Sequence, residues 1–272
     1  MPETTSWKPK RIRRVANAIP SGTSVVEVVT DAGAGYVKFL GNREGPHVLA
    51  AEYVGTRLAA ELGLPTLDWS LLEYDGIPEI TLKPSGKALP GTAWSTRKVE
   101  GSIWSGECKD LDVIENQEDL AKLVLLDQWT LNCDRYRPLP PPPRINYGNV
   151  FFSRESIQSS KLRLLAIDHS HIFTCGNPFR PDMARIDKVR ENTAFGVFPH
   201  FTSKMKRQDA QAAVDAMNRV PMDTIRAIVT DIPTDWEVSD DIRRAMIEFL
   251  SDRRNWLSAH FTTSLFPQNE LF

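Results

Sequence analysis

The feature that constrains the fold most is the order of polar residues around two short apolar segments in the middle of the chain. A stretch with helical periodicity, residues 116–131, ends shortly before Asp134 and Arg135. Asn149 then opens one short segment of strand character, and Asp168 closes the next. The sequence therefore predicts a helix end and two strand ends that bring an acid, an amide and a second acid together.

Residues of these types in this order are the ones that phosphoryl-transfer enzymes use: one acid meets the acceptor hydroxyl, while an amide and a second acid hold magnesium. Mg²⁺ prefers carboxylate or amide oxygens, completed by phosphates and waters. Each residue also has a simpler interpretation, because Asp134 and Arg135 can form a salt bridge at a helix end and Asp168 can be a turn-forming acid. The order of the whole set favours phosphoryl transfer.

A second group of polar residues lies upstream. Residues 25–40 alternate in the manner of a β-hairpin, and residues 48–62 have helical periodicity. Lys38 falls inside the second strand, and Glu52 falls on the second turn of the helix. A strand lysine held by a helix glutamate is how kinases direct an ammonium group at nucleotide phosphates. Glu61 is the alternative partner, but it lies near the negative end of the helix, where a carboxylate is less favoured.

A polar loop between this strand and this helix contains Gly41, Asn42 and Arg43. Its position makes these three residues candidates, with Lys38 and Glu52, for contacts to a nucleotide. The glycines give weak support, because the sequence has neither the GxGxxG nor the GxxxxGK[ST] pattern of phosphate-binding loops.

Residues 67–73 and 78–82 are also typical of strands, and they are expected to complete a small sheet with the hairpin of residues 25–40. The following residues, 83–107, are rich in glycine, serine, proline, threonine and tryptophan. They predict either a connection between two lobes or a wall that faces the substrate.

A proline-rich segment separates the first acid from the amide. Protein-kinase catalytic loops place the asparagine about five residues after the aspartate, whereas Asn149 lies 15 positions after Asp134. Residues 137–144 occupy the excess, and a proline run cannot continue a helix, so it can bulge outward as a rigid loop. Asn146 is the reserve candidate for the amide. The run could instead bind an aromatic-lined groove of a partner.

The remaining third of the chain is expected to be mostly helical. Residues 207–217, 222–229 and a final helix capped near Ser239 carry apolar residues every three to four positions, as buried stripes require. They are assigned to packing. Residues 173–200 precede them, at the place where kinases carry activation or substrate loops, and they are the expected acceptor surface.

Cysteine and histidine usage gives no sign of a soft-metal site. Cys108, Cys133 and Cys175 are odd in number and far apart, which argues against a disulfide framework or a zinc cluster and fits a reducing cytoplasm. His169 and His171 follow the second acid, but Mg²⁺ avoids imidazole, so they are expected to shape the site or to be structural.

Composition indicates a soluble protein with no membrane segment. Hydrophobic residues make up 41% and the net charge is -2, and no apolar run approaches the ~20 residues that cross a bilayer. Residues 1–10 are polar, without the apolar core of a secretory signal. Residues 8–14 are basic, but aromatic residues do not interleave with them, so they are expected to be a solvated arm and nucleic acid is not expected as a partner.

The chain resembles the HipA-like kinases in six features taken together. These are the Asn-x-Asp-Arg segment, the asparagine before an apolar strand, the Ile-Asp-His segment, the Tyr-Val-Lys-Phe strand, the glycine loop and the helix that ends in Gly-Leu-Pro. The resemblance extends over residues 25–174. It implies an α+β, two-lobed kinase-like fold, with a small antiparallel-sheet lobe in residues 1–107 and a mostly helical lobe in residues 108–272.

The resemblance also implies roles for the residues. Asp134 would be the catalytic base, with Arg135 beside it, Asn149 and Asp168 would hold Mg²⁺, and Lys38 would contact the phosphates of ATP. The implied reaction is transfer of the γ-phosphoryl group to a serine or threonine of a protein. The implied partners are that protein substrate and an antitoxin-like or regulatory protein.

Two alternatives remain open at the level of the sequence. A small-molecule kinase is one, because nothing in the sequence shows a peptide groove. A catalytically impaired pseudokinase that binds nucleotide or a partner is the other, because Asn149 is displaced from the usual spacing.

Overall fold

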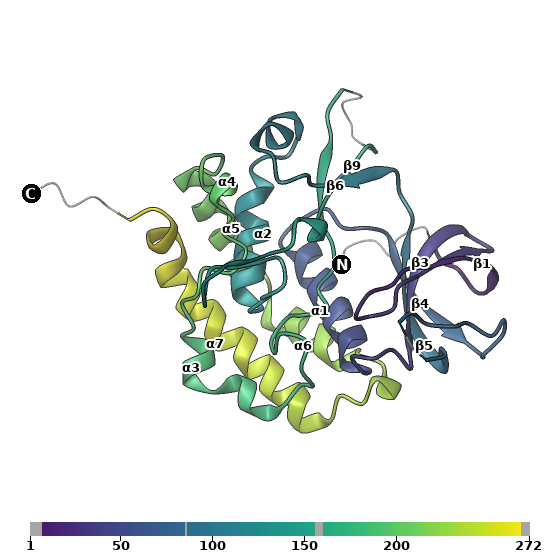
Figure 1. Ribbon diagram of the computed structural model, residues 1–272. Helices are drawn as coiled ribbons and strands as arrows, with labels where there is room; N and C mark the ends of the chain where they lie inside the picture. Colours follow the sequence, from purple (N-terminus) through teal and green to yellow (C-terminus); the bar gives the residue numbers. More distant parts are fainter. Residues whose placement is uncertain (1–6, 85, 156–159, 268–272) are drawn as a thin grey trace, which may run out of the picture.

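The computed structural model describes residues 7–84, 86–155 and 160–267, with a β-sheet at one end of the molecule and most of the helices at the other (Figure 1). The sheet has five antiparallel strands in the order β1-β2-β3-β5-β4. Their bounds are β1 Ile12–Ala18, β2 Val26–Thr30, β3 Gly33–Leu40, β4 Trp69–Tyr74 and β5 Leu89–Arg97.

The hairpin of β2 and β3 forms as the alternation predicts. Val26 and Val28 of β2 are buried together with Val37 and Phe39 of β3, so one face of the hairpin belongs to the core. Lys38 therefore lies on the opposite face, where it is paired with Trp94 of β5.

Helix α1 (His47–Glu61) follows β3 and contacts both the sheet and the helical region. Most of its residues are buried. Gly63 follows its carboxyl end with a φ of +71°, which favours glycine, and the amides of Gly63 and Leu64 donate to the carbonyls of Ala60 and Ala59. The predicted helix and its glycine end are confirmed.

Residues 83–107 correct the sequence interpretation. They contribute β5, a strand that the sequence did not predict and that lies between β3 and β4 inside the sheet. The residues after β5 line a cavity, and their role as a wall that faces the substrate stays a prediction. The expected strand over residues 78–82 is reduced to one isolated bridge between Thr81 and Lys87. The physical reason is competition for the place beside β3, which the longer and more buried β5 occupies.

The basic residues 8–14 also differ from the expectation of a solvated arm. Their second half belongs to the edge strand β1, which pairs with β2. The amides of Lys10 and Arg11 donate to the carboxylate of Asp31. Backbone pairing therefore fixes this segment, although several of its basic side chains are exposed.

The helical region is built around α2 (Asp119–Trp129) and the long helix α7 (Asp240–Leu265). The other helices are α3 Ile186–Val189, α4 Pro199–Thr202, α5 Arg207–Arg219 and α6 Met222–Thr230, with 3-10 turns at Cys108–Val113, Tyr147–Asn149, Pro181–Ala184 and Thr234–Trp236. A second sheet has the order β10-β9-β6, and a separate hairpin pairs β7 with β8. These strands are β6 Gly101–Ile103, β7 Tyr136–Arg137, β8 Arg144–Ile145, β9 Val150–Ser153 and β10 Arg163–Ala166.

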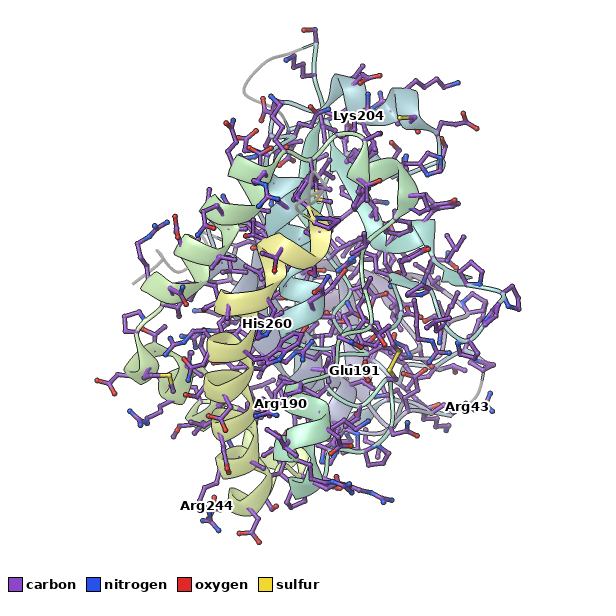
Figure 2. The ribbon with its side chains drawn as sticks, turned by 90° about the vertical axis from the view of Figure 1, so that its left-hand side faces the viewer. Arg43, Arg190, Glu191, Lys204, Arg244 and His260 are labelled. Atoms are coloured by element: carbon purple, nitrogen blue, oxygen red, sulfur yellow. A yellow bond between two sulfur atoms is a disulfide. The ribbon has the colours of Figure 1, made fainter. Side chains whose placement is uncertain are left out.

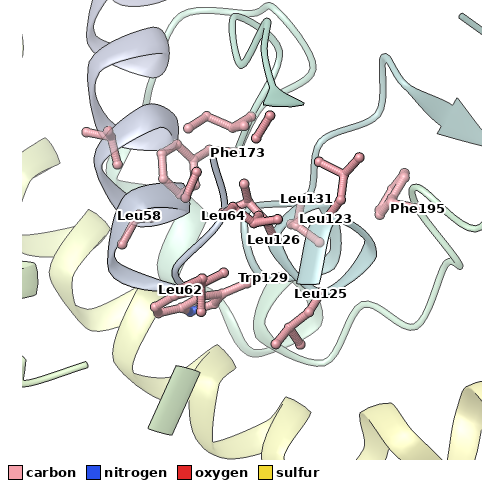
Figure 3. Close-up of a cluster of buried hydrophobic side chains, with 14 of the residues drawn as sticks. Leu58, Leu62, Leu64, Leu123, Leu125, Leu126, Trp129, Leu131, Phe173 and Phe195 are labelled. Carbon is pink, nitrogen blue, oxygen red and sulfur yellow. The ribbon is translucent and has the colours of Figure 1, made fainter. Parts of the chain in front are cut away.

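The core lies where α1 meets α2, and Figure 3 shows Leu58 of α1 and Leu64, just after this helix, in one cluster with leucines of α2. Trp129 ends α2 in this cluster and donates its indole N–H to the carbonyl of Leu250 in α7 at 2.9 Å. Arg253 of α7 is also buried and donates to the carbonyl of Gln128 at 2.5 Å. These contacts hold the carboxyl end of α2, from which the catalytic candidates follow, in a fixed position.

Residues 173–175 return to the end of α2. The amide of Phe173 donates to the carbonyl of Thr130 at 2.6 Å, and Cys175 forms a disulfide with Cys133, with the two Cα atoms 5.6 Å apart. The expectation that the cysteines form no disulfide is therefore wrong for this pair. The two cysteines are 42 residues apart in sequence, and only the folded chain brings them together. No helix in the described part of the chain is long and apolar enough to cross a membrane.

Candidate active site

Lys38 is the point at which the sheet, α1 and the end of β10 meet. Its Nζ donates to Oε1 of Glu52 at 2.5 Å and to Oδ1 of Asp168 at 3.2 Å. Glu52, and not Glu61, is the helix residue in contact with the lysine. Asp168 lies two residues after β10 and has a φ of +55°, a backbone conformation that L-residues rarely adopt. The structure thus brings three of the sequence candidates together.

The charges of this cluster follow from burial and from each other. Burial would lower the pKa of Lys38, but the carboxylates of Asp168 and Glu52 outweigh it and raise that pKa, so the ammonium stays charged. Burial raises the pKa of Glu52 to about 7. Burial also acts to raise the pKa of Asp168, but the ammonium of Lys38 and the hydrogen bond from Ser170 outweigh it and lower that pKa. Asp168 is therefore ionised, and its side chain is 35% exposed.

Asp134 lies in the turn that follows α2 and is nearly buried. Its Oδ1 is paired with the guanidinium of Arg144, from β8. Its Oδ2 accepts from Nδ2 of Asn149 at 2.8 Å and from Nδ2 of Asn146 at 3.1 Å. The two asparagines that the sequence offered as alternatives therefore both contact the same acid.

Arg135 is fully buried, so it cannot touch a substrate directly. Its Nε donates to Oδ2 of Asp127 at 2.9 Å, and its Nη1 donates to the carbonyls of Asn149 at 2.5 Å and Ile167 at 3.1 Å. One guanidinium thus ties together the end of α2, the start of β9 and the residue before Asp168. Arg135 thus holds its neighbours in place, and the contact of Asp134 with a substrate hydroxyl stays a prediction.

Ser170 and His171 connect the two halves of the site. The hydroxyl of Ser170 donates to Oδ1 of Asp168 at 2.8 Å and lies 3.1 Å from Nδ1 of His171. The same ring nitrogen lies 3.7 Å from Oδ2 of Asp134, and Nε2 lies 3.8 Å from Oε2 of Glu44. Asp168 and Asp134 therefore belong to one chain of polar contacts, which reaches the glycine loop.

The glycine loop holds its own shape. Asn42 is buried, with its amide bonded to the carbonyl of Phe39 at 2.8 Å and to the N–H of Glu44 at 3.0 Å. Gly41 has a φ of +85°, and a Cβ there would lie 2.4 Å from the carbonyl oxygen of Lys87. Arg43 is exposed at the edge of the molecule (Figure 2). Nucleotide contacts by Gly41, Asn42 and Arg43 stay predictions, since none of the three lines the described cavities at Lys38.

Two adjoining cavities open beside this cluster. The first, of about 140 Å³, is lined by Lys38, Glu52 and Asp168. The second, of about 760 Å³, is lined by the end of β5, by residues 98–101 and by Phe151. Tyr36, Leu67 and Ile167 belong to the walls of both cavities, which therefore lie next to each other.

The residues present fit a hard divalent cation. Asn149 uses Nδ2 to contact Asp134, and within the described residues no group donates to its Oδ1, so that oxygen is available to a metal. Asp168 offers an ionised and partly exposed carboxylate. In the described residues, no three His, Cys, Asp or Glu side chains are placed so that they could hold a metal ion by themselves. Two protein oxygens completed by phosphates and waters are the usual arrangement for magnesium.

Sequence reasoning missed three residues of the site. Asp127 looked like one more position on α2, and Ser170 and Arg144 were given no specific contact. The only signal for Asp127 was an acid on the buried side of a helix, which usually requires a partner. The signal for Arg144 was a cation that ends the proline run.

Solved structures share this architecture. A proinflammatory kinase of Helicobacter pylori, CtkA, superposes with a TM-score of 0.59 at 12% identity, covering 95% of this chain and 97% of that chain. HipA of Shewanella oneidensis MR-1, solved with HipB and operator DNA, gives a TM-score of 0.46 at 11% identity, covering 94% and 67%. No curated protein sequence matches the chain. The likeness to CtkA shows that the α+β fold is kinase-like, with an antiparallel sheet first and helices second.

The sequence itself supplies the family. The model of the HipA-like kinase family matches residues 28–266, which is most of the chain. The matched span contains the contact between Lys38 and Asp168 and the contact between Asp134 and Asn149. The chain therefore belongs to the HipA-like kinase family.

Proposed function

We propose that this kinase transfers the γ-phosphoryl group of ATP to a serine or threonine hydroxyl of a protein, with Mg²⁺ as cofactor. The observation that carries the proposal is the chain of contacts from Glu52 through Lys38 to Asp168. It continues through Ser170 to His171, whose Nδ1 lies 3.7 Å from Oδ2 of Asp134. The pair of Asp134 and Asn149, at 2.8 Å, and the pair of Lys38 and Asp168, at 3.2 Å, are the two halves that phosphoryl transfer needs.

The cavities support a placement for the nucleotide. The larger cavity combines the aromatic and apolar side chains of Tyr36, Phe151 and Ile167, which suit a purine ring, with charged residues of the segment after β5. The smaller cavity lies next to it and is lined by Lys38, whose ammonium is held by two acids and so points in one direction. Both cavities allow a nucleotide to bind with its base in the larger cavity and its phosphates towards Lys38.

The reaction requires one new bond and one broken bond. The acceptor hydroxyl oxygen bonds to the γ-phosphorus, the bond from that phosphorus to the β,γ-bridging oxygen breaks, and ADP leaves. Asp134 orients the hydroxyl and takes its proton. Lys38 holds the phosphates in line. Bound magnesium would supply charge neutralisation between Asn149, Asp168 and the phosphate oxygens.

Phosphate transfer in purified protein tests the proposal. We expect ATP-dependent incorporation of labelled phosphate into proteins of a lysate, removed by EDTA and restored by magnesium. Asp134→Ala is expected to reduce the rate by roughly 10²–10⁴-fold, the usual contribution of a general base. The matched control is Arg226→Ala on α6, an exposed residue that forms an ion pair with the exposed Asp223. Equal rates for Asp134→Ala and Arg226→Ala would refute the proposal.

A nucleotide-binding pseudokinase is the second candidate, and one observation favours it. Arg144 occupies Oδ1 of Asp134, where an acceptor hydroxyl would have to bind. Nucleotide binding without phosphate transfer would identify this function. A small-molecule kinase would instead turn over ATP only with a metabolite fraction, and phosphopeptide mapping after incubation with lysate separates it from a protein kinase.

A regulatory protein partner of the antitoxin type stays a prediction of family membership. Co-purification with the full chain, followed by mass spectrometry, tests it. A partner that changes the rate of phosphate transfer when it is added back would support the prediction.

A further inference from the structure

Two arginines lie opposite each other on the hairpin formed by β7 and β8. Arg137 of β7 is the register partner of Arg144 of β8. Residues directly opposite in an antiparallel pair project from the same face, and like charges in such a pair repel. A hairpin of only two residue pairs has little backbone bonding with which to offset that repulsion. The face that carries the two guanidinium groups is therefore suited to an anion.

Only one of these guanidinium groups has an acidic partner. Arg144 pairs with Asp134, whereas Nε of Arg137 is buried and has no hydrogen-bond partner. The described residues provide no ion pair to Arg137. A buried donor without a partner is unfavourable, and more so when it is charged. One more anion at this face would satisfy Arg137 and offset the repulsion from Arg144.

The anion must arrive together with the acceptor. Asp134 is nearly buried, its Oδ2 already accepts from Asn146 and Asn149, and its Oδ1 is covered by Arg144. An acceptor hydroxyl can reach Oδ1 only when Arg144 moves aside. The Arg144 side chain is 48% exposed, so it has room to move. Once displaced, it needs a new anionic partner within reach of the hairpin.

We propose that Arg137 and Arg144 form an acceptor-recognition site that binds a carboxylate next to the serine or threonine to be phosphorylated. This inference rests on the proposed function and names its substrate class, an acidic peptide segment. A carboxylate replaces Asp134 as the partner of Arg144, reaches Arg137, and leaves Oδ1 of Asp134 to the hydroxyl. A neutral acceptor displaces the same ion pair without any compensating contact.

The proline segment between the two strands suits this role. Residues 138–143 are mostly exposed, and prolines restrict their backbone, so the hairpin can present both arginines without a large loss of chain entropy. The γ-phosphate of the nucleotide is the other anion that could approach Asp134. If the arginines bind a carboxylate of the acceptor, they control kcat/KM for the peptide. If they bind the γ-phosphate, they control the KM for ATP, and the experiment measures both constants.

The experiment compares two serine peptides that are identical except for glutamate or glutamine on both sides of the serine. We expect the glutamate peptide to have the higher kcat/KM, by roughly tenfold to a hundredfold, the usual range for hydrogen bonds to a charged group. Arg144→Gln and Arg137→Gln are expected to remove the preference, and Arg144→Glu to reverse it. Arg226→Gln, an exposed arginine on α6, is the matched control and keeps the preference.

Three results would overturn the inference. One is equal kcat/KM for the two peptides in the unmodified protein. Another is a preference that survives in Arg144→Gln. The third is a rise in the KM for ATP in Arg144→Gln with an unchanged ratio between the peptides, which would assign the arginines to the γ-phosphate.

Direct peptide binding keeps the inference separate from the proposed function. If no lysate protein or peptide receives phosphate, the proposed function fails. Calorimetric titration of the same two peptides then decides the inference by itself. Tighter binding of the glutamate peptide that is lost in Arg144→Gln supports it, and equal binding of both peptides overturns it.

Discussion

Replacing Arg135 by methionine is expected to destabilise the protein severely, although Arg135 touches no cavity. The side chains of Arg135 and Asp127 have no exposed surface, and their ion pair is 2.9 Å long. The same guanidinium holds the carbonyls of Asn149 and Ile167. Arg135→Met keeps most of the volume, so the change removes the charge and the hydrogen bonds rather than the packing.

The expected loss follows from the carboxylate that is left behind. Removing one partner of a buried ion pair costs ~3–5 kcal/mol, because the other charge stays buried without compensation. A domain of this kind has a total unfolding free energy of only ~5–15 kcal/mol. Burial already raises the pKa of Asp127 to about 6 with Arg135 present. Without Arg135 this pKa rises further, so the loss is larger at pH 8 than at pH 5, where Asp127 is protonated in the fold.

Urea unfolding followed by tryptophan fluorescence measures the loss, because Trp129 lies in the core beside these residues. A double-mutant cycle with Asp127→Asn isolates the pair, and the double variant is expected to be more stable than Arg135→Met alone. Arg226→Met is the control, since its ion pair with Asp223 is exposed and such pairs contribute ~0–1 kcal/mol. A loss below ~1 kcal/mol in Arg135→Met, or additive losses in the cycle, would show that the pair does not hold the site.

Three further outcomes are expected. Lys38→Met should weaken ATP binding at least about tenfold, measured by calorimetry, because the charged group at the end of the cavity is lost and tenfold corresponds to ~1.4 kcal/mol. Burial lowers the pKa of His169 to about 3, so the ring stays neutral in the fold and charges only on unfolding. The unfolding free energy should therefore fall by up to ~1.4 kcal/mol per pH unit below pH 6.5, and this extra slope should be absent in His169→Gln. Gly55→Ala should lower the thermal midpoint, because a Cβ there would lie 2.3 Å from Cβ of His169 and such overpacking reduces the unfolding free energy by ~1–3 kcal/mol.

The parts of the fold that the sequence predicts are those set by local periodicity. Alternation places Lys38 on one face of β3, and helical phase places Glu52 towards it, so both members of the contact follow from residues close in sequence. Strand β5 was missed because its place between β3 and β4 depends on pairing with segments far along the chain. Pro90 and Gly91 at its start also have the composition of a loop.

The candidate site divides in the same way. Residue types that perform chemistry, such as Asp134 and Asp168, stand out by order and spacing. Residues that hold these acids in place cannot be recognised in this way. Ser170 and His171, for example, contact Asp168 and Asp134 only because β10 ends next to the end of α2. A serine or histidine has many roles in a sequence, and contact geometry alone selects one.

The hairpin of β7 and β8 explains how Asn149 can lie 15 positions after Asp134 and still contact it. The unusual spacing is therefore not evidence against catalysis. Tyr136 pairs with Ile145, and the amide of Asn146 donates to the carbonyl of Arg135 at 3.0 Å, so the inserted residues leave and return at the same point. Arg135 then fixes the carbonyl of Asn149 directly. What restrains Asp134 is consequently the side chain of Arg144, and a partly exposed side chain can be displaced by an acceptor that offers it another anion.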